Sequence, residues 1–116
     1  MLLQMCKSKI ANASITACEL HYDGSITIDE KLIKAAGILP GERVQVVNLN
    51  NGARFETYVI RGKSGSGEIC LNGPAARQGY AGDRIHIISY ALMEPQEAKT
   101  FTAKVIKLNE HNRIKN

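Results

Sequence analysis

The dipeptide Gly24-Ser25 could carry out chemistry on its own backbone. Ser25 places a hydroxyl next to the Gly24 carbonyl, and glycine leaves that carbonyl open to attack. Attack converts the peptide bond to an ester, and elimination followed by hydrolysis leaves a ketone, a pyruvoyl group, at the new N-terminus. Such a ketone condenses with amines and accepts electrons from a breaking C–C bond, as a pyridoxal cofactor does. On local pattern alone, a Gly-Ser pair is an ordinary turn.

The elements on both sides of this dipeptide would hold it in place. Residues 8–20 are rich in apolar and β-branched side chains and predict a strand, which turn residues 21–25 interrupt. The strand pattern resumes at residues 26–28. Asp29 suits a helix N-cap and Gly37 the C-terminal cap of a short helix. A backbone bond between two strands can be held rigidly in a strained geometry, which favours self-cleavage.

The rest of the chain predicts a mainly β fold. Asn50-Asn51-Gly52 is a hairpin signal, residues 62–67 form a glycine-rich loop, and we expect the polar residues from 109 onward to fray. Many short strands with glycine-marked turns favour a closed barrel or a sandwich. Strands are predicted at residues 43–49, 55–61, 68–71, 84–92 and 102–108, and helical turns at residues 72–77 and 94–98.

Composition narrows the class of protein. The 116 residues fit one domain, 1–116, and a chain this short favours an enzyme that forms oligomers. The formal net charge of +4 suits nucleic acid or a small anionic substrate, but six aromatic residues are too few for a nucleic-acid stacking platform. The three cysteines have no CxxC spacing, so we expect no metal site and no disulfide framework. We expect a cytoplasmic protein without a signal peptide or membrane span.

Several segments together resemble one family, the pyruvoyl-dependent aspartate 1-decarboxylases, which are lyases that make β-alanine for pantothenate and coenzyme A. The resemblance covers about residues 1–108. The matching segments are Lys7-Ser8-Lys9-Ile10, His21-Tyr22-Asp23-Gly24-Ser25, Ala35-Ala36-Gly37-Ile38-Leu39, Asn51-Gly52-Ala53-Arg54-Phe55-Glu56-Thr57-Tyr58 and Leu71-Asn72-Gly73-Pro74-Ala75-Ala76.

The resemblance implies a double-psi β-barrel with a few short helices and a homotetramer with active sites shared between subunits. It also implies self-cleavage between Gly24 and Ser25, giving a β-chain of residues 1–24 and an α-chain of residues 25–116. The cofactor would be the pyruvoyl group derived from Ser25, with no metal and no pyridoxal phosphate. The expected partner is L-aspartate, with no nucleic acid and no membrane; the sequence leaves open whether a maturation factor is needed.

The resemblance also implies roles for the reacting residues. Ser25 would be the pyruvoyl precursor that forms the Schiff base with the substrate amine. Thr57 would stabilise the scissile carbonyl during cleavage and contact substrate, and Tyr58 would be the proton donor. A phenol is chemically able to reprotonate the carbon from which CO2 has left. Strand alternation puts Thr57 and Tyr58 on opposite faces, so a twist, bulge or subunit boundary must bring them to one site.

The substrate-binding residues implied by the resemblance form two groups. Arg54 and Lys9 would face the two carboxylates of aspartate, and an arginine offers a planar fork for one of them. The departing carboxylate should be the less stabilised one, so that its loss relieves an unfavourable ground state. The second group is the segment Asn72, Gly73, Pro74 and Ala75, which would bind substrate through its backbone and the Asn72 side chain.

Three positions depart from the family pattern. Relatives commonly have histidine where this chain has Ala11, which puts histidine-assisted self-cleavage in doubt. Arg77 stands where His or Cys-type residues are frequent, and Pro74 replaces the usual alanine. None of these changes removes a residue that the chemistry needs. His86 lies on an apolar strand pattern and is expected to be a core or interface histidine.

Two alternatives stay open at this point. Residues 39–44, Leu-Pro-Gly-Glu-Arg-Val, resemble the looped hairpins of bacterial DNA-binding regulators, which would bind nucleic acid in a steeply salt-dependent way. The second alternative is a pyruvoyl-dependent decarboxylase that acts on another amino acid, such as glutamate.

Overall fold

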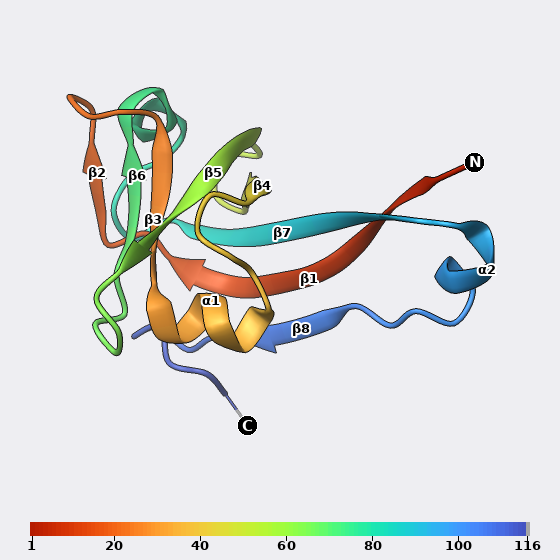
Figure 1. Ribbon diagram of the computed structural model, residues 1–116. Coiled ribbons are helices and arrows are strands. Elements are labelled where there is room, and N and C mark those ends of the chain that lie inside the picture. Colours follow the sequence, from red (N-terminus) through yellow and green to blue (C-terminus); the bar gives the residue numbers. More distant parts are fainter. Residues whose placement is uncertain (116) are drawn as a thin grey trace.

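A long two-stranded ladder runs through the molecule, formed by β1 (Leu3–Ser14) and β7 (Arg84–Met93) (Figure 1). The structure, a computed structural model, describes residues 1–115. The other elements in chain order are β2 (Ala17–Glu19), β3 (Ser25–Asp29), α1 (Glu30–Ala36), β4 (Arg43–Asn48), β5 (Arg54–Gly62), β6 (Ile69–Asn72), the 3₁₀ helix η1 (Gly73–Gln78), α2 (Pro95–Ala98) and β8 (Lys104–Lys107).

The eight strands form one mixed sheet in the order β2-β6-β3-β5-β4-β7-β1-β8. Three neighbouring pairs are parallel, namely β2 with β6, β3 with β5, and β1 with β8. The sheet coils around a single core. The predicted mainly β fold with a few short helices is confirmed, and the coiling is consistent with the expected double-psi barrel. The hydrogen-bonded order is open, however, because β2 and β8 do not pair with each other.

The core is built largely from β-branched side chains of the central strands. Ile26 and Ile28 of β3, Ile69 of β6, and Ile85 and Ile87 of β7 are all fully buried. Burying one such side chain contributes about 1.5–3 kcal/mol relative to leaving it exposed. In the antiparallel pairing of β3 with β6, residues 25–28 lie opposite residues 72–69, so β3 begins opposite the last residue of β6.

Helix α1 closes one side of this core. The Asp29 side chain accepts a hydrogen bond from Lys31 N over 2.8 Å at the N-terminus, and Gly37 ends the helix with a φ of 72°. Both caps were predicted. Leu32 and Ile33 turn inward and are buried. The helix follows β3 without a loop, so its packing anchors the strand that begins at Ser25.

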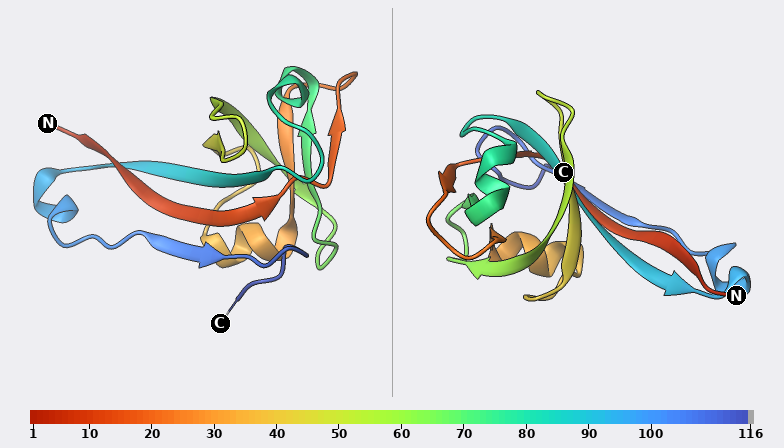
Figure 2. Two further views of the ribbon diagram at one scale, coloured as in Figure 1. Left: turned by 180° about the vertical axis from the view of Figure 1, so that it is seen from behind. Right: turned by 90° about the horizontal axis from the view of Figure 1, so that it is seen from above.

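The outer halves of β1 and β7 extend away from the coiled sheet as an arm that ends at the N-terminus and α2 (Figure 2). Exposed apolar side chains lie on this arm, including Met1, Leu2 and Leu92. No helix within residues 1–115 is both long enough and apolar enough to cross a membrane.

The single strand predicted over residues 8–20 is wrong at both ends. β1 begins at Leu3, opposite Met93, and the chain leaves β7 after Ser14. At Ile15 and Thr16 it crosses to β6, where Thr16 N donates to Ile69 O over 2.8 Å and β2 starts at Ala17. The apolar pattern continues through this crossing, so periodicity alone could not reveal it.

The segment after residue 108 does not fray as expected. Asn112 is 2% exposed, and its side-chain amide donates to Ser14 O and to Gly67 O over 2.9 and 2.8 Å. Asn109 accepts hydrogen bonds from His111 N and Arg113 N. Asparagine side chains replace missing backbone partners here, and so they hold a polar segment in place.

Candidate active site

Ser25 is the first residue of β3 and is fully buried. It lies directly opposite Asn72 in the antiparallel pairing of β3 with β6. Residues that face each other in this way present their side chains to the same side. Asn72 Nδ2 donates a hydrogen bond to Ser25 Oγ over 2.9 Å, and Ser25 Oγ lies 3.3 Å from Asp23 O. The Ser25 hydroxyl is therefore held in a defined position next to the Gly24–Ser25 bond.

The carboxamide of Asn72 is fully engaged. Its Nδ2 donates a second hydrogen bond to Thr27 Oγ1 over 2.9 Å, and its Oδ1 accepts one from Cys70 Sγ over 3.3 Å. Both Asn72 and Cys70 are buried. Neither Thr27 nor Cys70 was predicted as a site residue. Their positions two residues from Ser25 and Asn72 on paired strands were the signal, because strand alternation puts them on the same face.

Gly73 packs against the backbone that precedes Ser25. Its φ is 63°, and a Cβ placed on it would lie 2.5 Å from Tyr22 O and 2.9 Å from Gly24 N. Only glycine fits at this position. Beside it, the Cδ atom of Pro74 would be 3.4 Å from a Cβ added to Gly24. The segment from Asn72 to Pro74 thus forms one wall against the dipeptide at residues 24–25.

A pocket of about 360 Å³ opens at Gly24. Thr57 and Tyr58 both line this pocket, although neighbouring residues of β5 point to opposite faces of the sheet. The reason is that β3 pairs with β5 only from Ile26 and Val59 onward. Within residues 1–115, no strand therefore pairs with residues 54–58 on the β3 side, and Gly24 and η1 border this free edge. The lining residues are Gly24, Phe55, Glu56, Thr57, Tyr58, Pro74, Ala75 and Gln78.

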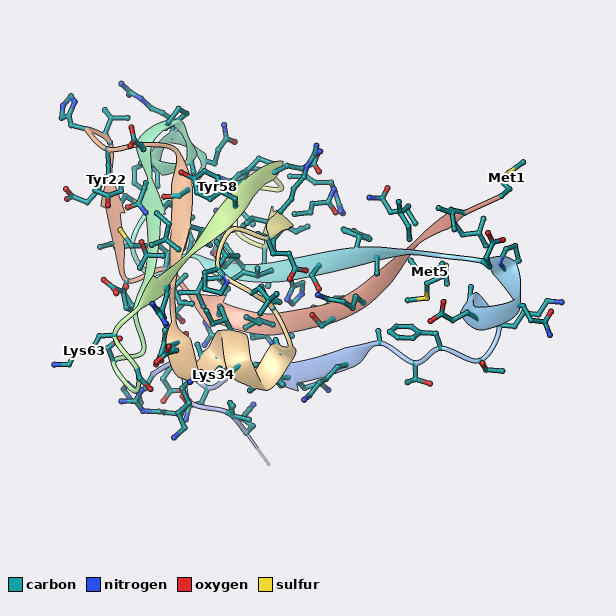
Figure 3. The ribbon with its side chains drawn as sticks, viewed as in Figure 1. Met1, Met5, Tyr22, Lys34, Tyr58 and Lys63 are labelled. Carbon is teal, nitrogen blue, oxygen red and sulfur yellow. The ribbon has the colours of Figure 1, made fainter. Side chains whose placement is uncertain are left out.

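Tyr58 is 42% exposed at this pocket, and Thr57 is half-buried. In Figure 3, Tyr58 on β5 and Tyr22 on the loop before β3 both lie at the end of the molecule opposite Met1. Phe55, Glu56 and Gln78 also line the pocket and were not predicted as site residues. No local motif marks Gln78, whose place depends on how η1 packs.

Lys9 and Arg54 do not line this pocket. Glu56 of β5 lies opposite Gln45 of β4, Gln45 lies opposite Ile88 of β7, and Ile88 lies opposite Lys9 of β1. Opposite residues share a face of the sheet, and so do alternate residues of one strand. Lys9 therefore lies on the same outer face as Arg54 and Tyr58. Lys9 is three strands away from β5 along the sheet, about 14 Å at about 4.8 Å per strand. Arg54 Nη1 donates to Gln45 Oε1 over 2.8 Å. The same Gln45 oxygen accepts a hydrogen bond from Tyr90.

Comparison with known proteins gives the family of this chain. Residues 1–115 match the family described as Aspartate decarboxylase. The chain belongs to the aspartate decarboxylase family. It is 59% identical over 114 residues to an aspartate 1-decarboxylase of Pelotomaculum thermopropionicum, covering 98% of this chain and 86% of the relative. The corresponding enzyme of Carboxydothermus hydrogenoformans is 58% identical, over 98% of this chain and 90% of its own. The aspartate 1-decarboxylase of Acetivibrio thermocellus is 56% identical, over 100% of this chain and 92% of the relative.

A histidine that is not among the family residues expected above lies near Lys9. His86 is half-buried on β7, and its Nδ1 accepts a hydrogen bond from Asn12 N over 3.2 Å. Burial lowers the pKa of His86, and the positive charge of Lys9 lowers it further. The lowered pKa favours the neutral imidazole, and because Nδ1 accepts from Asn12 N, the proton of that neutral form lies on Nε2.

No group of three or more His, Cys, Asp or Glu residues within residues 1–115 is arranged to hold a metal ion. The residues around Gly24 and Ser25 form a tightly packed polar corner. Ser25 supplies the hydroxyl, Asn72 a hydrogen-bond donor to it, and Gly73 the close packing that leaves the dipeptide little room to move. This corner, with the pocket beside it, is the candidate active site.

Proposed function

We propose that this chain is a proenzyme that cleaves itself between Gly24 and Ser25 and then converts L-aspartate to β-alanine and CO2. Membership of the aspartate decarboxylase family supports the reaction. The observation that carries the self-cleavage is the buried hydrogen bond of 2.9 Å from Asn72 Nδ2 to Ser25 Oγ. It supports a serine that is positioned for attack on its own peptide bond.

Cleavage begins with attack by Ser25 Oγ on the Gly24 carbonyl carbon. The C–N bond breaks, the serine nitrogen takes a proton, and an ester joins Gly24 to the Ser25 side chain. Loss of the Ser25 Cα proton then expels the Gly24 carboxylate. Water replaces the nitrogen of the resulting dehydroalanine and releases ammonia. Thr57 lines the pocket at Gly24, and its hydroxyl would donate to the carbonyl oxygen as negative charge develops there.

Once formed, the pyruvoyl group supplies a ketone for the substrate amine and an acceptor for the electrons of the breaking C–C bond. The chain's own residues bind and orient the substrate. Asn72 lies opposite residue 25, Gly73 packs against Gly24, and Pro74 and Ala75 line the pocket at Gly24. They would contact the substrate close to its amine.

Arg54 and Lys9 would hold the carboxylates of aspartate. Arg54 is exposed, and its partner Gln45 is neutral, so its charge stays available for an anion. The retained carboxylate should receive the stronger contacts, while the departing one is left poorly stabilised. Tyr58, with its exposed ring at the pocket, would deliver a proton to the carbon that loses CO2.

The distance of Lys9 from the pocket supports the expected homotetramer with shared active sites. One copy has Gly24, Thr57 and Tyr58 at its pocket, whereas Lys9 lies three strands away on the outer face. A second copy could supply the cationic groups that the pocket of the first copy lacks. A cytoplasmic enzyme of this kind would provide β-alanine for pantothenate and coenzyme A.

Denaturing mass spectrometry with a β-alanine assay tests the proposal. We expect two fragments that meet at residues 24 and 25, the larger one with a blocked N-terminus, and β-alanine formed from aspartate. The Ser25→Ala variant should remain one intact chain. Two fragments in that variant, or a wild-type chain that stays intact and inactive, would refute it. Faster turnover of glutamate than aspartate would point to the other pyruvoyl decarboxylase, and steeply salt-dependent DNA binding to a regulator.

A further inference from the structure

We propose that Cys70 and Thr27 are positioning residues for self-cleavage, because together they turn the Asn72 carboxamide so that its N–H groups face Ser25. This inference rests on the proposed self-cleavage. The three contacts are Cys70 Sγ to Asn72 Oδ1 at 3.3 Å, and Asn72 Nδ2 to Ser25 Oγ and to Thr27 Oγ1 at 2.9 Å each. One carboxamide thus links a thiol on one side to two hydroxyls on the other.

The thiol gives the carboxamide a preferred orientation. Cys70 is a weak donor through its S–H and a weak acceptor through its sulfur, and here its S–H points to Asn72 Oδ1, with Leu71 O a more distant acceptor at 3.9 Å. Burial raises the pKa of Cys70, and the charge of Glu68 raises it further, so the thiol keeps its proton. Turning the Asn72 side chain over would point a buried N–H at a sulfur that accepts poorly. An unsatisfied buried donor is costly, and this cost favours the observed orientation.

Thr27 acts on the opposite side of Asn72. Its hydroxyl accepts one Nδ2 hydrogen, which leaves the other for Ser25. The register supports this arrangement, because Thr27 lies opposite Cys70 and Ser25 opposite Asn72 on the paired strands. The four side chains therefore form one connected group that spans β3 and β6.

The orientation matters because Ser25 Oγ must lose its proton as it attacks. An N–H that points at Oγ stabilises the negative charge that develops there. A carbonyl in the same place would bind the serine proton and repel the developing charge. The same N–H can follow the oxygen into the ester and stabilise the carboxylate that later departs. Cys70 would thus influence the cleavage rate without touching the scissile bond.

Two matched pairs of variants test this proposal. Cys70→Ala and Cys70→Ser are similar in volume, but only serine has a donor. Thr27→Val and Thr27→Ser differ in the same way, because only serine keeps an acceptor. Each precursor is made by cell-free translation, its conversion to fragments is followed over time by denaturing mass spectrometry, and its melting temperature is recorded in parallel. We expect Cys70→Ala and Thr27→Val to be cleaved about tenfold more slowly, and the two serine variants to stay within about twofold of wild type.

The outcomes separate this inference from the proposed function. A wild-type chain that never cleaves overturns both. A wild-type chain that cleaves while Cys70→Ala cleaves equally fast overturns only the role of Cys70. If Cys70→Ser is as slow as Cys70→Ala, the donor is not what matters and the proposal fails. Equal melting temperatures for the alanine and serine variants, together with unequal cleavage rates, would support positioning over general stability.

Discussion

Gly73 and Gly24 touch through their backbones: a Cβ on Gly73 would lie 2.9 Å from Gly24 N and 3.0 Å from Gly24 Cα. Real Cβ atoms do not approach other atoms this closely, so a side chain on Gly73 would displace Gly24. Gly73 also has a φ of 63°, which side chains disfavour. The start of η1 therefore holds Gly24 in place by close contact of its backbone.

The first prediction is that Gly73→Ala strongly slows self-cleavage. The matched control is Gly52→Ala, because Gly52 has a φ of 76° but nothing within 4 Å of an added Cβ. Both variants should lose about 1 kcal/mol of stability from the backbone conformation. Only Gly73→Ala should remain largely uncleaved when both are followed by denaturing mass spectrometry. Equal cleavage of the two variants would mean that this contact does not position the Gly24–Ser25 bond.

The second prediction separates processing from turnover at Tyr58. Tyr58→Phe should be cleaved at the wild-type rate, because the phenol is not needed for attack by Ser25. It should make β-alanine at least about 100-fold more slowly, since it lacks the phenol that we propose as the proton donor. Tyr80→Phe is the control, because Tyr80 is 80% exposed and does not line the pocket. Normal β-alanine formation by Tyr58→Phe would remove Tyr58 from the donor role.

The third prediction concerns the carboxylates of aspartate. Arg54→Ala should raise the KM for aspartate at least about tenfold, because a charge-assisted hydrogen bond is lost, while cleavage continues. Arg61→Ala is a control on the same strand, since Arg61 forms its ion pair with Glu30 at 3.1 Å. Steady-state kinetics on the cleaved proteins measures both. An unchanged KM in Arg54→Ala would place the carboxylate contact elsewhere.

Local signals in the sequence predicted the parts of the fold that depend on single residues. The caps of α1 at Asp29 and Gly37 follow from the chemistry of one side chain and from one positive φ. The turn at residues 50–52 follows in the same way, because Gly52 has a φ of 76°. These features need no knowledge of distant parts of the chain.

The site itself could be predicted only where a family motif names it. Ser25 and Asn72 are 47 positions apart, and Asn112 bonds to Ser14 across 98 positions. Such contacts depend on strand register and crossings, which hydrophobic pattern does not specify. Nothing in the sequence next to Cys70 indicates a place beside Ser25 and Asn72. Its contact with Asn72 follows only once β3 and β6 are paired.

The fourth prediction is that Asp29→Asn destabilises the fold by about 1–3 kcal/mol at neutral pH. Asp29 is buried, and its carboxylate accepts hydrogen bonds from Gly65 N and Gly67 N over 2.9 and 2.8 Å. Asparagine would turn an N–H toward one of these donors. Urea unfolding of both forms, in a Ser25→Ala background that keeps the chain whole, measures the loss.

The pH dependence of this effect has a definite sign. Burial alone would raise the pKa of Asp29, but the backbone N–H groups of Gly67 and Gly65 lower it below 3.8 overall. A carboxyl whose pKa is lower in the folded state stabilises the fold at pH values above its pKa in the unfolded chain. That stability is lost as the pH falls through its pKa in the folded state. The advantage of wild type over Asp29→Asn should therefore shrink below about pH 3.8. An advantage that is independent of pH would contradict this account. The control variant is Glu110→Gln, which changes an exposed carboxylate and should alter the free energy of unfolding by at most about 0.5 kcal/mol.

The fifth prediction tests whether Lys9 and His86 lie close enough to interact. Burial and then the charge of Lys9 lower the pKa of His86. Removing a positive charge makes the protonated imidazole more favourable, so Lys9→Met should raise that pKa, while burial keeps it below 6.5. An NMR titration of the His86 ring protons measures the shift. Lys7→Met is the control, because Lys7 is already paired with Glu42 at 2.6 Å, and it should leave the titration unchanged. An unaltered His86 titration in Lys9→Met would show that the two side chains do not lie close enough to interact.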